Sequence, residues 1–367
     1  MAAWKNKRPA FELQGQKVEA GTRSLINLPV GVFTNNTRVD LSVVVVHGRR
    51  PGPTLLVTGC IHGDEINGAE IIRRLLKSKS ISRLKGTLLV VPIVNVPAFL
   101  NRSRYLPDRR DLNRLYPGSA KGSLGARLAK VVSSELLPQA DIVIDLHTGT
   151  VNRPNLPQIR VTVDDQESIE LAKIFNAPVT VLAPLRNNSF RSLCREEGKQ
   201  ILLFESGEAL RLDAHSIRYG VQGIVSVMRQ LGMLAPKKGP ASKKKTDTVI
   251  CTKTYWERAT IGGLFTPLIA LGKTVEAEDI LGFISDPFGG IETPITANYQ
   301  GVVIGRTNEG LADEGDALFH IALFGNLDRA RDQMALGNQG LDVAAEIDDH
   351  PVPDEPFIED EFDMEQQ

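Results

Sequence analysis

Residues 54–77 read TLLVTGCIHGDEINGAEIIRRLLK and place a strand, a glycine-rich turn and a helix in one short stretch. The run at residues 54–58 is apolar and β-branched, which favours a buried strand. In residues 69–77, isoleucines and leucines recur at helical spacing and share one face. Three glycines lie between the two elements, where they allow sharp turns and leave room for a substrate. This stretch predicts a strand that turns directly into a helix.

The same order of strand, loop and helix recurs along the first part of the chain. Further apolar, β-branched runs lie at residues 41–46, 87–94, 141–146, 159–163 and 201–204. Helical periodicity is visible in residues 124–137 and 216–234. Strands that alternate with helices predict an α/β domain with a mixed, largely parallel sheet and helices on both faces. We expect this domain to span residues 1–236.

The remainder of the chain changes character twice. Residues 237–247, KKGPASKKKTD, contain five lysines with single glycine, proline and serine residues and nothing to bury, so they predict an exposed linker. Residues 248–325 consist of short apolar runs punctuated by glycine, which predict a small all-β module. From residue 326 to residue 367 the chain becomes acidic and has little to bury, so we expect a flexible tail.

The spacing of glycines in the β module resembles the barrel-sandwich modules of the biotinyl/lipoyl type. Those modules carry an attachment lysine at a hairpin tip, whereas the matching residues 289–298, GGIETPITAN, contain no lysine. Covalent carriage of biotin or lipoate is therefore not expected. A packing or pocket-rim role is the better interpretation, and Tyr255 and Tyr299 are candidates to reach a cleft.

Composition and charge narrow the class of protein. The 367 residues carry a formal net charge of -1, so no global positive field recruits nucleic acid or membrane. The three cysteines, Cys60, Cys194 and Cys251, are far apart, which argues against a disulfide scaffold. Neither a signal-peptide core nor a membrane-spanning apolar run is visible. We expect a soluble, cytoplasmic protein, whose oligomeric state the sequence leaves open.

His62 and Glu65 lie three residues apart in the turn, where the chain enters the helix. This spacing can direct an imidazole and a carboxylate toward one point. Zinc in hydrolases is commonly bound by two histidines and one glutamate, with a fourth position left for water. Alone, such a pair is more often an ordinary surface or core contact, so its meaning depends on the rest of the chain.

Two further polar residues follow predicted strands. His147 comes directly after the run at residues 141–146, and sites in doubly wound sheets form beyond the carboxyl ends of strands. It is a candidate third ligand, the alternative being a histidine satisfied within the core. Glu205 follows the run at residues 201–204 and is a candidate general base for hydrolysis. Glu208 is its rival, and a capping or salt-bridging glutamate is the alternative.

The other four histidines lack a comparable setting and are interpreted as structural or surface residues: His47, His215, His320 and His350. Residues 102–118, RSRYLPDRRDLNRLYPG, are dense in arginine. Guanidinium groups bind carboxylates bidentately and can stabilise an oxyanion. A solvated basic loop is the alternative, and the Asn113-Arg114 pair within it argues for a binding role.

Four short motifs occur in the order of the succinylglutamate desuccinylase/aspartoacylase family, a branch of the zinc carboxypeptidase-like hydrolases. The motifs that resemble the family are His62-x-x-Glu65, Asp111-Leu112-Asn113-Arg114, Asp145-Leu146-His147 and Phe204-Glu205. The resemblance covers roughly residues 51–234 and extends to the β-rich C-terminal module. It implies a zinc carboxypeptidase-like fold and one Zn²⁺ per chain, held by His62, Glu65 and His147.

The resemblance also implies roles for other residues. Glu205 would activate the water, and Asn113 and Arg114 would bind the substrate's carboxylate. Asp111 resembles the carboxylate that orients a zinc-binding histidine, and Asp145 could do similar work. Among the loop's arginines, Arg104 is the most similar to the family's oxyanion arginine, with Arg102, Arg109 and Arg110 as alternatives. Arg191 resembles a second arginine that binds the substrate.

These residues together imply a zinc-dependent amidohydrolase, a deacylase that cleaves the amide bond of a small N-acylated amino acid or related carboxylate-bearing substrate. A carboxypeptidase-like peptidase would use the same metal and the same Asn-Arg pair, but a module that closes over the cleft would favour small substrates. A non-catalytic protein that binds a metal or a partner is the second alternative. Loss of Glu205 or of a metal ligand would have suggested it, and all are present.

Overall fold

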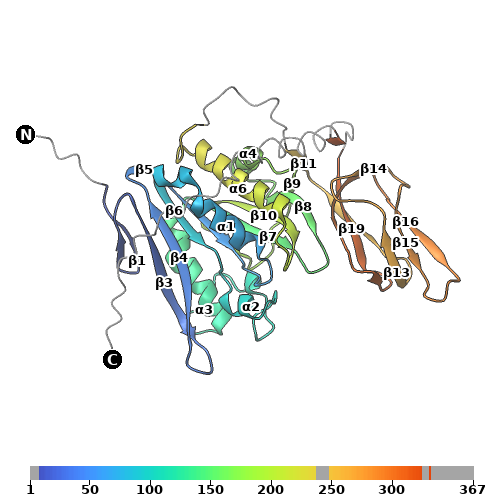
Figure 1. Ribbon diagram of the computed structural model, residues 1–367, viewed down its shortest axis with the longest axis horizontal. Coiled ribbons are helices and arrows are strands. Elements are labelled where there is room, and N and C mark those ends of the chain that lie inside the picture. The colour runs from blue at the N-terminus through green and yellow to red at the C-terminus, as the bar shows by residue number, and fades with distance from the viewer. Residues whose placement is uncertain (1–7, 237–247, 325–329, 332–367) are drawn as a thin grey trace, which may run out of the picture.

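The computed structural model describes residues 8–236, 248–324 and 330–331. The predicted linker at residues 237–247 lies outside the described residues, as does the predicted tail apart from residues 330 and 331. In the described part of the chain, no helix is long and apolar enough to cross a membrane. A large α/β part and a β-rich part lie at opposite ends of the molecule (Figure 1).

A 13-stranded sheet extends through both parts of the described chain. Its strands are β3 (Thr22–Val32), β4 (Arg38–His47), β5 (Arg50–Gly59), β6 (Lys85–Val91), β7 (Ile142–Gly149), β8 (Asn155–Val161), β9 (Val179–Leu182), β10 (Gln200–Glu208), β11 (Val249–Cys251), β12 (Thr254–Arg258), β14 (Thr274–Val275), β17 (Gly301–Arg306) and β19 (Ala317–Leu323). Two smaller sheets contain β1 (Phe11–Leu13) with β2 (Gln16–Val18), and β13 (Gly263–Pro267) with β15 (Ile280–Ser285), β16 (Glu292–Thr296) and β18 (Leu311–Ala312).

The order of the main sheet is β12-β19-β17-β8-β10-β7-β5-β6-β4-β3. Its central strands β10, β7, β5 and β6 run parallel, whereas the pairs that flank them are antiparallel. Every residue of β7 is buried, as expected for a strand covered on both faces. The predicted mixed sheet is therefore confirmed, with its parallel strands at the centre.

Helices cover both faces of this sheet, as predicted. They are α1 (Asn67–Lys77), α2 (Val96–Leu100), α3 (Leu124–Val131), α4 (Gln166–Phe175), α5 (Phe190–Glu196) and α6 (Ala214–Gln230). On one face Ile71 of α1, Phe175 of α4 and Ile224 of α6 share an apolar core with the sheet, and these three helices lie together in Figure 1. On the other face, Leu128 of α3 and Leu193 of α5 belong to a second core.

Two predicted helices differ from the structure at their ends. The helical pattern at residues 124–137 becomes a π-helical turn at Val132–Leu136, followed by a 3₁₀ turn that contains Pro138, which has no backbone N–H to continue an α-helix. The helix predicted from residue 216 begins two residues earlier, because Asp213 accepts a hydrogen bond from the Ser216 N–H at 2.6 Å and caps it.

The predicted β module is present at the C-terminal end of the described chain. The sheet of β13, β15, β16 and β18 faces β17 and β19 across a core that includes Phe265, Ile284 and Phe319. The module also continues the main sheet, because β11 pairs with β9, and β17 pairs with β8 at Gly305 and Asn155. Through these pairs the module is joined to β8 and β9 of the main sheet.

Candidate metal centre

Three adjacent parallel strands position the residues that the sequence singled out. β5 leads into the turn that holds His62 and Glu65, before α1 begins. His147 lies near the carboxyl end of β7, and Glu205 lies opposite it on β10 as its register partner. Parallel strands present their carboxyl ends at one edge of a sheet, so residues distant in the sequence meet there.

The turn after β5 does not use its glycines in the predicted way. The left-handed residue is Cys60, with φ of 53°, and none of the three glycines has a positive φ. A Cβ on Gly63 would lie 2.1 Å from the backbone carbon of Ala98 in α2, and a Cβ on Gly68 would lie 3.1 Å from Leu146 Cβ. These glycines make room for the protein's own backbone and core, and the expectation that they leave room for a substrate is wrong.

His62, Glu65 and His147 form one buried group. Nδ1 of His62 lies 2.7 Å from Oε1 of Glu65, and Nδ1 of His147 lies 2.7 Å from Oε2 of the same carboxylate. One potential ligand atom from each residue lies within 4.8 Å of the others. Two imidazoles and a carboxylate are a donor set typical of catalytic zinc sites. The group is able to hold a metal ion.

The outer nitrogens of both histidines contact aspartates. Nε2 of His62 lies 3.2 Å from Asp111, and Nε2 of His147 lies 2.8 Å from Asp145. Asp145 is itself fixed by the Thr58 hydroxyl, which donates to it at 2.7 Å. Carboxylates commonly hold the far nitrogen of a metal-binding histidine and so set its orientation. This arrangement leaves the Nδ1 atoms of both rings directed at the centre.

The carboxylates in and around the group of His62, Glu65 and His147 favour positive charge at its centre. Burial lowers the pKa of His147, but the carboxylates of Asp145 and Glu65 outweigh it and raise that pKa well above its usual value. Burial raises the pKa of Glu65, yet the two histidines hold it well below its usual range. A divalent cation would satisfy the same negative potential. The residues present therefore fit a metal ion in donor type, geometry and charge.

Arg104 lies directly against this group. Its Nη1 lies 3.0 Å from Oε1 of Glu65, and its Nη2 lies 3.4 Å from Oδ2 of Asp111. The other arginines considered as the oxyanion arginine are exposed and do not line the cleft: Arg102, Arg109 and Arg110. Of these four arginines, the fold brings Arg104 alone to the centre.

A cleft of about 870 Å³ opens over the group, and Asn113, Arg114 and Arg191 also line it. Asn113 is buried and accepts a hydrogen bond from the Phe190 N–H at 2.8 Å. Arg191 is buried as well, and its Nη2 donates to the Pro184 carbonyl while its Nη1 has no partner among the described residues. Burial and neighbouring arginines lower the pKa of Arg191 to about 10.

Glu205 lies in the same cleft with one-fifth of its side chain exposed. Its Oε2 accepts a hydrogen bond from Asn155 Nδ2 at 2.7 Å, and its Oε1 lies 3.2 Å from Arg160 Nε. Glu208, the rival glutamate, accepts from the Asn152 N–H at 3.0 Å and is not among the residues that line the cleft. Glu205, and not Glu208, therefore lines the same cleft as His62, Glu65 and His147.

Several cleft residues were not anticipated from the sequence. Trp256 and His320 of the β module stack on each other, with ring centroids 4.5 Å apart, and both line the cleft. Tyr255 and Tyr299 do not line it, because Tyr255 lies on the opposite face of β12 and donates to the Tyr299 carbonyl at 2.8 Å. The remaining unanticipated residues include Arg153, Asn155, Arg160, Arg186 and Lys253.

Comparisons with known proteins agree with this geometry. Residues 51–231 match the succinylglutamate desuccinylase/aspartoacylase catalytic domain. Over 307 residues the chain is 26% identical to an N-α-acetyl-L-2,4-diaminobutyric acid deacetylase of Halomonas elongata, and the match covers 81% of this chain and 90% of that protein.

Two solved structures resemble most of the chain. The product-bound ectoine utilization protein EutE (DoeB) of Ruegeria pomeroyi is 28% identical, with a TM-score of 0.73 and coverage of 83% of this chain and 95% of that chain. A succinylglutamate desuccinylase/aspartoacylase of Rhodobacter sphaeroides is 25% identical, with a TM-score of 0.73 and coverage of 83% and 96%. With its motifs, its fold and these matches in agreement, the chain belongs to the succinylglutamate desuccinylase/aspartoacylase family.

Proposed function

We propose that this protein is a zinc-dependent amidohydrolase that removes the acyl group from a small N-acylated amino acid or a related carboxylate-bearing substrate. The observation that carries the proposal is the group of His62, Glu65 and His147 in one cleft with Glu205. The family match and the deacetylase of Halomonas elongata support cleavage of an amide bond. Zinc bound by the three residues would supply an activated water and polarise the amide carbonyl.

The chain's own residues divide the remaining work. Glu205 takes a proton from the attacking water and passes it to the leaving amine. Arg104, which lies against Glu65 and Asp111, donates hydrogen bonds to the carbonyl oxygen as negative charge develops on it. Asp111 and Asp145 keep the two imidazoles in the orientation that directs Nδ1 to the centre.

The cleft also contains groups that are suited to bind a carboxylate. Arg114 and Arg191 line it together with Arg186, and Asn113 lies beside them. The buried Nη1 of Arg191 is a donor without a described partner, and an unpaired buried charge is costly. A substrate carboxylate would satisfy it through a charge-assisted hydrogen bond.

The β module supplies part of the wall of the cleft, which favours small substrates over peptides. Trp256 and His320 belong to the β module and line the cleft from that side. Burial and nearby Arg160 lower the pKa of His320 to about 3, so its ring stays neutral above that pH and stacks on Trp256. A peptidase would need an open groove past these rings.

The proposal is tested by incubating the zinc-loaded protein with a panel of N-acetyl amino acids, N-succinyl amino acids and short peptides. Turnover is measured as the amount of free amine released. We expect hydrolysis of at least one acyl amino acid and none of the peptides. Cleavage of peptides alone would establish the peptidase alternative. Zinc binding without any turnover would establish the non-catalytic alternative.

Replacing Arg104 by glutamine is expected to lower kcat by about 10²- to 10³-fold, because removal of one oxyanion donor costs that much in comparable sites. The matched control is Arg110→Gln, since Arg110 belongs to the same loop but is exposed and contacts Asp108 and Ser123. Steady-state kinetics on both variants measure the difference. Equal rates for the two variants would remove Arg104 from this role.

A further inference from the structure

Asn155, the first residue of β8, connects the glutamate of the cleft to the β module. Its side-chain amide donates to Oε2 of Glu205 at 2.7 Å. Its backbone is the point at which β8 pairs with β17, opposite Gly305. Asn155 therefore contacts both the proposed general base, Glu205, and β17, the strand that joins the module to the main sheet.

The segment that precedes Asn155 is also held by the module. The Asn308 N–H donates to the Asn152 carbonyl at 2.6 Å, and the Arg306 N–H donates to the Pro154 carbonyl at 3.4 Å. These backbone bonds come from β17 and the residues just after it. They fix the start of β8, and with it the Cα of Asn155, relative to the module.

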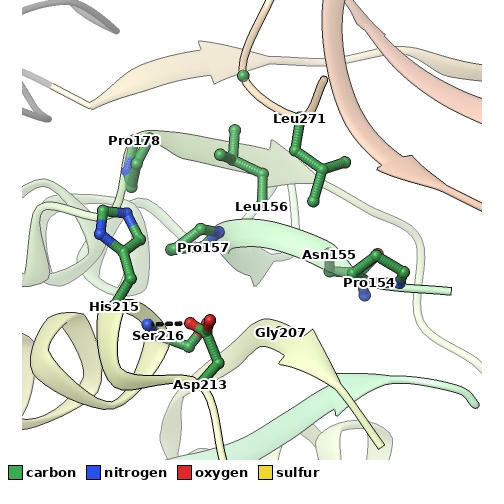
Figure 2. Close-up of a pocket in the computed structure, with 11 residues that line it drawn as sticks. Pro154, Asn155, Leu156, Pro157, Pro178, Gly207, Asp213, His215, Ser216 and Leu271 are labelled. Atoms are coloured by element: carbon green, nitrogen blue, oxygen red, sulfur yellow. Dashed lines mark hydrogen bonds between the residues drawn. The ribbon is translucent and has the colours of Figure 1, made fainter. Parts of the chain in front are cut away.

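Asn155 lies between two cavities. One is the cleft of the metal group, and the other is a pocket of about 390 Å³ lined by β8, the start of α6 and the module. Figure 2 shows Leu156 of β8 and Leu271 of the module pointing toward each other across this pocket, with Asn155 beside Pro154. With space on both sides, the position of the Asn155 side chain depends on its polar contacts and on β17.

Gly305 leaves the space that the Asn155 amide occupies. A Cβ at position 305 would lie 2.9 Å from Oδ1 of Asn155, which is closer than such atoms normally approach. The added Cβ would also lie 3.2 Å from Cβ of His320, a less severe approach, so its closest contact is with the Asn155 side chain and the methyl group would displace the amide first. A substitution at Gly305 can therefore disturb the hydrogen bond between Asn155 and Glu205.

We propose that the C-terminal β module positions the general base: β17 holds Asn155, and the Asn155 amide fixes the orientation of the Glu205 carboxylate. Arg160 engages the other oxygen of Glu205, so the amide sets the rotation of the carboxylate about its axis. Asn155 is a positioning residue that acts through Glu205, and the inference rests on the proposed role of that glutamate. A hydrogen bond to a carboxylate is among the stronger ones in proteins.

The test compares wild-type protein with Asn155→Ala, Gly305→Ala and the double variant, each zinc-loaded, on a substrate that the wild type hydrolyses. We expect Asn155→Ala to lower kcat by about 10- to 100-fold, the range for misplacement of a reacting group by up to about 1 Å. KM and zinc content should stay unchanged. Gly305→Ala should lower kcat in the same way, though less.

The double variant distinguishes positioning from general damage. Once the amide of Asn155 has been removed, the methyl group added at position 305 has lost its closest contact and keeps only the 3.2 Å approach to Cβ of His320. Its effect on kcat should therefore be much smaller in the double variant than in the otherwise wild-type protein. The control is Gly310→Ala in the same module, where a Cβ would meet nothing within 4 Å and kcat should stay at the wild-type value. Thermal unfolding of each variant shows whether it is folded.

Five outcomes decide whether the inference holds. Full kcat in Asn155→Ala, or effects that multiply in the double variant, would overturn the inference. A raised KM with unchanged kcat would instead assign Asn155 to substrate binding and overturn it as well. If Asn155→Ala does not fold, a wild-type kcat in Gly305→Ala would overturn the inference. A wild-type protein without turnover on any substrate would contradict the proposed function itself.

Discussion

Glu205→Gln is expected to lower kcat by about 10²- to 10⁴-fold, the range that general acid–base catalysis contributes, while zinc content stays at one per chain. The amide of glutamine keeps the size of the side chain but cannot take a proton from water. Zinc should remain because Glu205 contacts Asn155 and Arg160 and is not part of the group of three ligands. Steady-state turnover and metal analysis of the same preparation measure both quantities.

The matched control for this variant is Glu208→Gln on the same strand. Glu208 accepts a hydrogen bond from the Asn152 N–H, which a glutamine oxygen can also accept, and it does not line the cleft. Its kcat should remain close to that of the wild type. A metal-loaded Glu205→Gln protein that keeps full activity would show that another group takes the proton.

His147→Gln is expected to abolish turnover through loss of the metal. The substitution removes one of the three proposed ligands and leaves Asp145, which is fully buried, without the imidazole it contacts at 2.8 Å. Leaving a buried charge uncompensated costs on the order of 3–5 kcal/mol, so the melting temperature should fall as well. Metal analysis, turnover and thermal unfolding measure the three effects.

A second histidine substitution controls for the loss of an imidazole elsewhere. His215→Gln changes a residue that lines the smaller pocket in Figure 2 and lies outside the metal group, so zinc content and kcat should not change. Full zinc occupancy in His147→Gln would mean that the metal binds elsewhere. It would also remove the basis for assigning Nδ1 of His147 as a ligand atom.

Much of the fold could be predicted because the central strands are buried on both faces. Such strands consist of near-continuous apolar residues, and the runs at residues 54–58, 141–146 and 201–204 all lie within central parallel strands or begin one residue before them. Two of the elements that were missed have weaker patterns. β3 alternates between exposed and buried residues, and α5 has only seven residues.

The core of the candidate site could be predicted for a related reason. Parallel strands place their carboxyl ends at one edge, so polar residues that follow buried runs are brought together without any information about loops. The arginine loop is a harder case, because Arg102, Arg109 and Arg110 have the same chemistry as Arg104. Only the path of the folded loop decides that Arg104 meets Glu65.

The sequence by itself predicted the central strands, because near-continuous apolar runs mark them. It also predicted the candidate metal-binding residues and Glu205, because these polar residues follow such runs. The tertiary structure alone decided what covers and adjusts that group. Asn155 meets Gly305 from 150 positions away, and Trp256 faces the cleft while Tyr255 faces the other side of its strand. Such contacts depend on how two sheets are joined, and no spacing within the chain encodes them.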